Sequence, residues 1–223
     1  MPDSLSLSFF IIFDSFPDLV KKQVDKGNIP ARAIQISDII REVYFYSNAM
    51  RKERDIWMYY EKQQLFVKLN GKNLRYLGPD ERSIFMLLLK IPVEKSALYI
   101  APAFPIESPW HESTPGIHYI KNISLTTAIE IFKKERSAFG LYNLTIQQQQ
   151  HQYVDYTELA TIAGEKSELC FFFNAHNPDV PETIMNVCNI HTIKVGARNQ
   201  CNTIPARIML LNLYEDHMHA MRP

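Results

Sequence analysis

The sequence is short of glycine and cysteine and carries no excess of charge of either sign. Its 223 residues include 7 Gly and 3 Cys, and Lys plus Arg equal Asp plus Glu at 24 each. The three cysteines, Cys170, Cys188 and Cys201, form no Cys-x-x-Cys pair. This argues against a disulfide framework and a zinc ribbon, and it favours the reducing cytoplasm. The balanced charge indicates no particular partner, although a local basic patch can still bind nucleic acid.

Membrane-targeting segments and common catalytic motifs are also missing. The early apolar run 9–13 is too short to cross a membrane and lacks a preceding basic segment, so we interpret it as a buried strand. No GxGxxG, GxxxxGK[ST] or GxSxG pattern occurs. Four residues near the end have the composition of a metal site, but we interpret them as a solvated chain end and predict no metal: Glu215, Asp216, His217 and His219.

The sequence does contain an alternation of strand-like and helix-like segments. Apolar residues at three- and four-residue steps predict a helix over 34–50, at Ile36, Ile39, Ile40 and Val43. Pro79-Asp80-Glu81 predicts a helix start with the proline in the first turn, and Ser124 predicts another. The uninterrupted apolar run 169–173 is typical of a central parallel strand. We therefore predict one α/β domain, 1–223, with a mainly parallel sheet flanked by helices.

Other segments give more local predictions. Asn70-Gly71 predicts a turn after a strand at 65–69, with 74–77 returning as its hairpin partner. The proline-rich stretch 102–116 predicts a rigid loop that exposes Trp110. Glutamines 147–150 predict a surface loop. A strand at 97–100 and a helix at 181–187 are expected as well, and the apolar stretch 208–213 suggests the contact face of a homodimer.

Several short segments, taken in order, resemble one family. They are Arg51 to Arg54 at a helix end, Asn70-Gly71, Pro79-Asp80-Glu81-Arg82, and Ser113-Thr114-Pro115-Gly116. Their order and spacing resemble those of the archaeal tRNA pseudouridine N1-methyltransferases (the TrmY family) of the SPOUT superfamily, from about Ile29 to the C-terminus. The resemblance implies a C-terminal trefoil knot, a homodimer, and S-adenosylmethionine (SAM) held in the knot. It also implies methylation of a tRNA T-loop pseudouridine at N1.

The resemblance also implies a set of cofactor-binding residues. The family's Gly-Asp-His turn after the central strand corresponds to Asn174-Ala175-His176, and its later Leu-Gly-Pro turn corresponds to Val195-Gly196-Ala197. Because Asn tolerates the left-handed backbone region, Asn174 can replace the glycine. The predicted cofactor residues are Phe173, Asn174, His176, Val195, Gly196, Ala197, Cys201 and Ile204.

The implied reaction calls for cations and aromatic rings. Methylation at N1 requires the nitrogen to lose its proton and the charge on the uracil carbonyl to be stabilised, which an arginine can do. The catalytic candidates are Arg32, Arg51 and Arg82. The RNA-binding candidates, for which a solvated helix end with core aromatics is the alternative, are Lys52, Arg54, Arg75, Trp110 and Lys121. For the whole chain, the alternative is a degenerate SPOUT relative that binds RNA or a ribonucleoprotein without catalysis.

Overall fold

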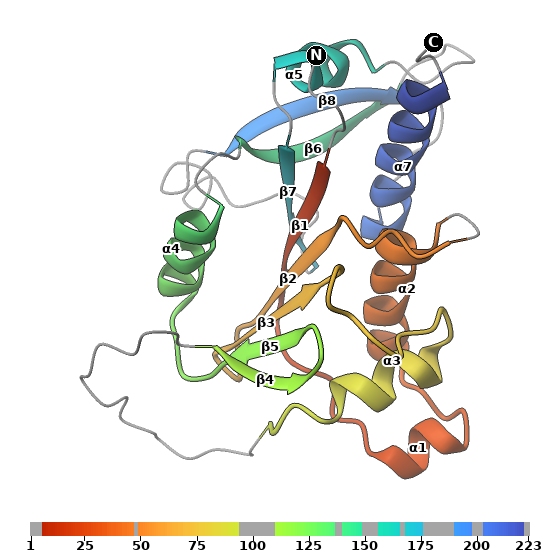
Figure 1. Cartoon of the computed structure of the whole chain (residues 1–223), viewed down its shortest axis with the longest axis vertical. Coiled ribbons are helices and arrows are strands. Elements are labelled where there is room, and N and C mark those ends of the chain that lie inside the picture. The colour runs from red at the N-terminus through yellow and green to blue at the C-terminus, as the bar shows by residue number, and fades with distance from the viewer. Residues whose placement is uncertain are drawn as a thin grey trace.

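Eight strands form one sheet, with helices along both of its faces (Figure 1). The computed structural model describes residues 6–46, 49–93, 110–136, 140–148, 156–165, 168–175, 190–197 and 203–220. The strands are β1 (Ser6–Phe13), β2 (Asp55–Tyr60), β3 (Leu65–Asn70), β4 (His111–Thr114), β5 (Ile117–Ile120), β6 (Gly140–Gln148), β7 (Glu168–Asn174) and β8 (His191–Ala197). The described helices are α1 (Lys21–Asp25), α2 (Ala31–Phe45), α3 (Glu81–Leu88), α4 (Leu125–Glu135), α5 (Thr157–Glu165) and α7 (Ile204–Ala220).

The sheet has a parallel half and an antiparallel half. Its strand order is β4-β5-β3-β2-β1-β7-β6-β8. Neighbours from β2 to β8 are parallel, and β3, β5 and β4 continue the sheet with antiparallel pairs. The prediction of an α/β protein with a mostly parallel sheet flanked by helices is confirmed. So is the central position of the run 169–173, since β7 lies between β1 and β6.

Both faces of the central strands are buried. Phe9, Ile11 and Phe13 of β1 pack in the cluster that includes α2 and α7. Phe10 and Ile12 point the other way, into a cluster with Ala128, Ile129 and Phe132 of α4. A strand covered on both faces has no solvated positions, and this is why β1 and β7 read as continuous apolar runs instead of alternating ones.

Helix starts follow the capping residues closely. Ser124 Oγ accepts a hydrogen bond of 3.1 Å from the backbone N–H of Thr127 at the start of α4, as predicted. At α3, Asp80 is the N-cap and its carboxylate accepts from Ser83 N at 2.8 Å. Pro79 therefore lies just before the cap, and its predicted place in the first turn is wrong.

Three local predictions are corrected by strand pairing. Residues 74–77 form no strand, because β2 and β5 already occupy the two edges of β3. His111–Thr114 of the predicted proline-rich loop forms β4, paired with β5. Gln147 and Gln148 belong to β6, because they pair with Gly196 and Ala197. The predicted strand 97–100 and helix 181–187 lie outside the described residues.

Candidate functional site

The strands that follow β1 and β7 in the chain lie on opposite sides of this pair in the sheet. From β1 the chain passes through α2, on the face of Phe9 and Ile11, to reach β2. The next described strand after β7 is β8, which lies beyond β6 on the other side. In open α/β sheets, ligands bind in the crevice at the carboxyl ends of strands whose connections diverge in this way. The topology therefore indicates a site at the ends of β1 and β7.

A charged cluster lies at the end of β1. Asp14 directly follows this strand, and its Oδ2 lies 3.1 Å from Arg32 Nη2 at the start of α2 and 3.0 Å from Lys62 Nζ. The hydrogen bond from Lys62, followed by that from Arg32, holds the pKa of the Asp14 carboxyl below its ordinary value. Asp14 is thus a carboxylate at neutral pH. Sequence reasoning missed this residue, although a charge directly after a buried strand was a usable signal.

The end of β7 lies beside the same strand. Asn174 pairs in register with Ile12, and the backbone N–H of Ala175 donates to Ile12 O at 2.8 Å. The turn expected to hold the cofactor therefore begins beside Ile12, which precedes Asp14 by two residues in the chain. Asn174 is half-buried, whereas Phe173 before it is fully buried.

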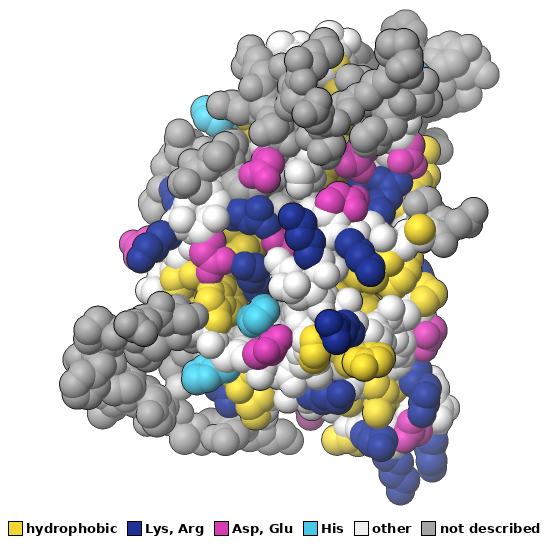
Figure 2. Space-filling model, in the orientation of Figure 1, with side chains coloured by type: hydrophobic (Ala, Val, Ile, Leu, Met, Phe, Trp, Pro, Cys, Tyr) yellow, Lys and Arg dark blue, Asp and Glu magenta, His cyan; other side chains and the backbone are white. Residues whose placement is uncertain are grey.

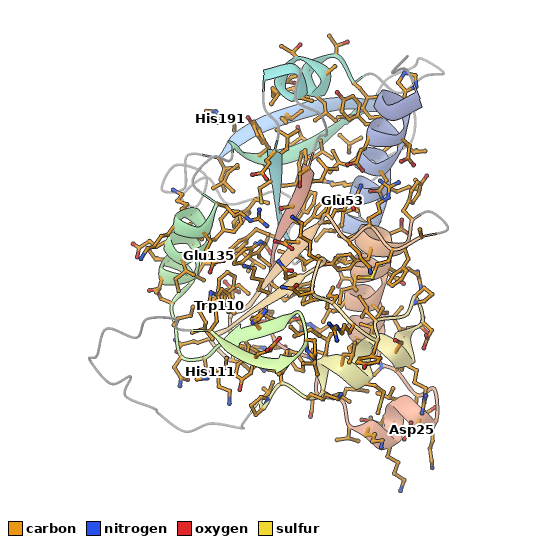
Figure 3. All side chains as sticks on the ribbon, in the orientation of Figure 1. Asp25, Glu53, Trp110, His111, Glu135 and His191 are labelled. Atoms are coloured by element: carbon orange, nitrogen blue, oxygen red, sulfur yellow. The ribbon has the colours of Figure 1, made fainter. Side chains whose placement is uncertain are left out.

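The three predicted catalytic arginines do not come together. Arg32 is at the carboxyl end of β1, with 38% of its side chain exposed. Arg51 follows α2, whose 15 residues span about 22 Å, and it binds Glu215 at 2.5 Å and Asp216 at 2.6 Å. Arg82 pairs with Asp25 at 3.1 Å, and Asp25 lies at the α1 end of the molecule (Figure 3). Of the three, Arg32 is the one that pairs with Asp14 at the carboxyl end of β1.

The predicted cofactor residues are only partly brought together. Phe173 and Val195 are fully buried and Ile204 is 3% exposed, all in the core on the α2 side. Their side chains pack in the core, which leaves their backbone groups as the possible contacts with a cofactor. Because β6 separates β7 from β8, Val195 lies about two strand spacings, roughly 10 Å, from β7. Gly196 and Ala197 continue β8, and His176 and Cys201 lie outside the described residues.

Two of the predicted RNA-binding residues have structural roles instead. Arg54 is fully buried, donates to Val43 O at 3.0 Å, and forms an ion pair with Glu215. It cannot face phosphates in this structure. Trp110 is half-buried, because its ring packs on Trp57 and Phe66 at centroid distances of 5.8 and 5.3 Å.

Trp110 is also fixed by a hydrogen bond. Its Nε1 donates to Glu135 at 2.5 Å, and Figure 3 shows both residues on the α4 side of the molecule. The remaining RNA-binding candidates are differently placed. Lys52 and Arg75 are exposed, and Lys121 Nζ lies 5.8 Å from the centroid of the Tyr119 ring.

Sequence similarity to known proteins does not identify the site. No protein-family model matches the chain, and no curated protein sequence matches it significantly. Across the described segments, no helix is long and apolar enough to cross a membrane. In the same part of the chain, no three His, Cys, Asp or Glu side chains are grouped so that they could hold a metal ion.

Proposed function

We propose that this chain is a cytoplasmic, SAM-dependent RNA methyltransferase of SPOUT type that methylates N1 of a tRNA T-loop pseudouridine. The position of Asn174 carries the proposal. The turn that corresponds to the family's cofactor turn begins at the carboxyl end of β7, next to β1, where diverging connections favour a ligand crevice. The ordered motifs from Arg51 to Gly116 support the substrate assignment.

The described ends of β1 and β7 fit a nucleoside-bearing cofactor in their polarity. Asp14 and Asn174 are half-buried polar groups, and each follows directly on buried apolar residues of its strand. An apolar site with few polar groups is the usual composition for such ligands. Backbone groups of Asn174 and Gly196 would hold the cofactor, which supplies a methyl group activated by a sulfonium centre.

Arg32 is the proposed catalytic residue. When N1 of the base gives its proton to water, negative charge is shared between N1 and the adjacent carbonyl oxygen. N1 would then take the methyl group from the sulfonium, which would leave as a neutral thioether, and the charge would be consumed as the N–C bond forms. A guanidinium directed at that oxygen stabilises the charge. Asp14 is then a positioning residue, because its ion pair orients Arg32 and its lowered pKa keeps it charged at neutral pH.

A homodimer with a C-terminal knot belongs to the same proposal. On α7, Ile208, Leu210 and Leu211 are buried in the core, whereas Met209 and Leu213 are 36% and 42% exposed. These two exposed residues are one helical turn apart and form the apolar stripe available to a second copy. The knot would form where the chain from Thr203 threads the loop 174–189, and residues 176–189 of that loop lie outside the described residues.

One observation favours the alternative of a relative that binds RNA without catalysis. The turn after β7 has Asn174 and Ala175 where the family has Gly and Asp, and the side chains of Phe173, Val195 and Ile204 are enclosed in the core. A site of this kind offers a cofactor fewer contacts, and loss of affinity for SAM would follow.

Calorimetric titration of SAM decides between the two. The Asn174→Gly variant should bind at least as well as wild type, because it restores the family residue, and Gly196→Val should not bind. Asn122→Gly is the control for the same substitution elsewhere, because Asn122 lies after β5, whereas Asn174 is the last residue of β7. Failure of both wild type and Asn174→Gly to bind millimolar SAM would overturn the methyltransferase and leave the alternative.

The catalytic assignment needs a separate assay. Transfer of a labelled methyl group to tRNA containing the T-loop pseudouridine should fall about 100- to 1,000-fold in Arg32→Gln, with SAM affinity retained. Lys133→Gln, at an exposed position on α4, should remain close to wild type. Equal losses in both variants would contradict the role of Arg32.

A further inference from the structure

Tyr76 is exposed and has an unusual backbone conformation. Its side chain is 83% exposed, whereas Val20, the next most exposed large apolar residue described, is at 56%. Its φ is +64°, in the left-handed region that side chains other than glycine rarely adopt. Such a conformation persists where the surroundings enforce it, and it occurs preferentially at functional sites.

The surrounding loop holds Tyr76 in this position. Ser83 Oγ donates to the backbone oxygen of Tyr76 at 3.2 Å and accepts from Gly78 N at 2.6 Å. Ser83 itself lies in the first turn of α3, where Asp80 caps its backbone N–H. On the other side, Leu74 is buried against the core. The loop is therefore fixed at both ends, and the tyrosine ring is presented to solvent in advance of any binding.

Two cations, Arg82 and Lys90, line the same hollow as Tyr76. Tyr76, Arg82, Met86, Leu87 and Lys90 line one open hollow of about 340 Å³, and Lys72, Arg75 and Lys90 are exposed. The pair of Arg82 with Asp25 leaves 65% of the arginine side chain exposed, and exposed pairs of this kind exchange readily. The nearby acids are engaged, Asp80 as the cap of α3 and Glu81 at 3.8 Å from Arg41. Figure 2 shows Lys and Arg side chains on the face in view, interspersed with Asp and Glu and with apolar side chains.

We propose that Tyr76 is a stacking platform for an unpaired RNA base, and that Arg75, Arg82 and Lys90 bind the phosphates beside it. An aromatic face accepts any base, while cations along the strand supply the affinity for the backbone. A protein partner could also use an exposed tyrosine, but Arg82 and Lys90 in the same hollow favour a polyanion. The inference rests on the proposed function in taking the polyanion to be RNA, and it does not require catalysis.

Fluorescence anisotropy with a labelled 12-nucleotide single-stranded RNA, without SAM, tests it. Tyr76→Gly should weaken binding about 5- to 150-fold, the range measured for loss of one stacking ring. Because glycine tolerates a positive φ, the same variant should melt at or above the wild-type temperature. Lost binding would then not be a folding defect. Tyr76→Phe keeps the ring and should bind within about twofold of wild type.

Charge variants complete the test. Lys90→Ala should weaken RNA binding and reduce the slope of log K against log salt concentration by about one. Lys133→Ala on α4 removes another exposed lysine and should change neither the affinity nor the slope. If Tyr76→Gly binds RNA like wild type, the inference is overturned while methyl transfer by the wild-type protein can still stand. Tyr76-dependent binding without SAM binding supports the inference and rejects the methyltransferase. Absence of RNA binding together with Tyr76-dependent self-association in sedimentation would overturn it in favour of a protein contact.

Discussion

Arg54 and Glu215 form an ion pair in which both side chains are buried, although the two residues are 161 positions apart in the chain. The arginine side chain is 0% exposed and the glutamate side chain is 4% exposed. The pair connects the segment before β2 to α7, and Asn212 of the same helix accepts a further hydrogen bond from Arg54. Burial lowers the pKa of Arg54, and Glu215 opposes this shift. Because an arginine stays charged even in the core, Glu215 supplies the counter-charge that the buried guanidinium needs.

Removal of Glu215 should destabilise the fold strongly. Glu215→Leu leaves the buried guanidinium without its main counter-charge, and we expect a loss of about 3–5 kcal/mol in the free energy of unfolding, measured with urea. Asp216→Ala is the control. Asp216 is 47% exposed in its pair with Arg51, so its removal should cost less than about 1 kcal/mol. Equal losses for the two variants would contradict the importance of burial.

The second member of the pair gives a rescue experiment. Adding Arg54→Met to Glu215→Leu removes the unpaired charge, so the double variant should recover most of the lost stability. A double variant less stable than Glu215→Leu would show that Arg54 acts mainly through its bonds to Val43 and Asn212.

Gly71 should tolerate no side chain. A Cβ there would lie 2.3 Å from Arg54 O and 2.7 Å from Lys52 O, so Gly71→Ala must push the backbone apart and should cost about 2–3 kcal/mol. Gly27 has a φ of +71° but nothing within 4 Å of an added Cβ, so Gly27→Ala should cost only the backbone term, about 1–2 kcal/mol. A smaller loss at Gly71 than at Gly27 would be inconsistent with the close approach.

The acid side of the stability curve should depend on Asp14. Its folded-state pKa lies below the ordinary 3.8, so the unfolded state takes up protons first as the pH falls. The stabilisation from Asp14 is fully present above the ordinary pKa and disappears as the pH falls through the folded value. Asp14→Asn should therefore lower the urea midpoint at about pH 7 and have little effect near pH 2. A difference that persists at the acid end would rule out this linkage.

Lys62 should account for part of the same effect. Its hydrogen bond is the largest cause of the lowered pKa of Asp14, so Lys62→Met should shift the titration of Asp14, followed by NMR, back towards the ordinary value. Arg82→Met, which removes a different exposed pair, should leave that titration unchanged.

Cys170 should be unreactive in the folded protein. Its thiol is fully buried in β7, and burial raises the pKa of the thiol far above its ordinary value. Since the thiolate is the reactive form, a variant carrying Cys188→Ser and Cys201→Ser should react with a disulfide reagent only after denaturation. Rapid labelling under native conditions would mean that β7 opens readily.

The sequence by itself determined those elements whose signal is local. The apolar run of β1 and β7, the periodicity of α2 and the caps Ser124 and Asp80 each depend on residues within a few positions of one another. Such patterns follow from side-chain spacing in a helix or strand and from hydrogen bonds within one turn. They indicated an α/β protein and a central strand, but not which strands are neighbours.

Tertiary structure decided everything that depends on which elements meet. The failed hairpin at 74–77 reflects β5 taking the edge of β3, and the burial of Arg54 reflects Glu215 arriving from α7. The placement of Asn174 beside the strand that leads to Asp14 arises because β7 inserts between β1 and β6. The left-handed backbone of Tyr76 is set by Ser83 and Leu74. Local periodicity does not predict these contacts, because each is formed by residues that only the folded chain brings together.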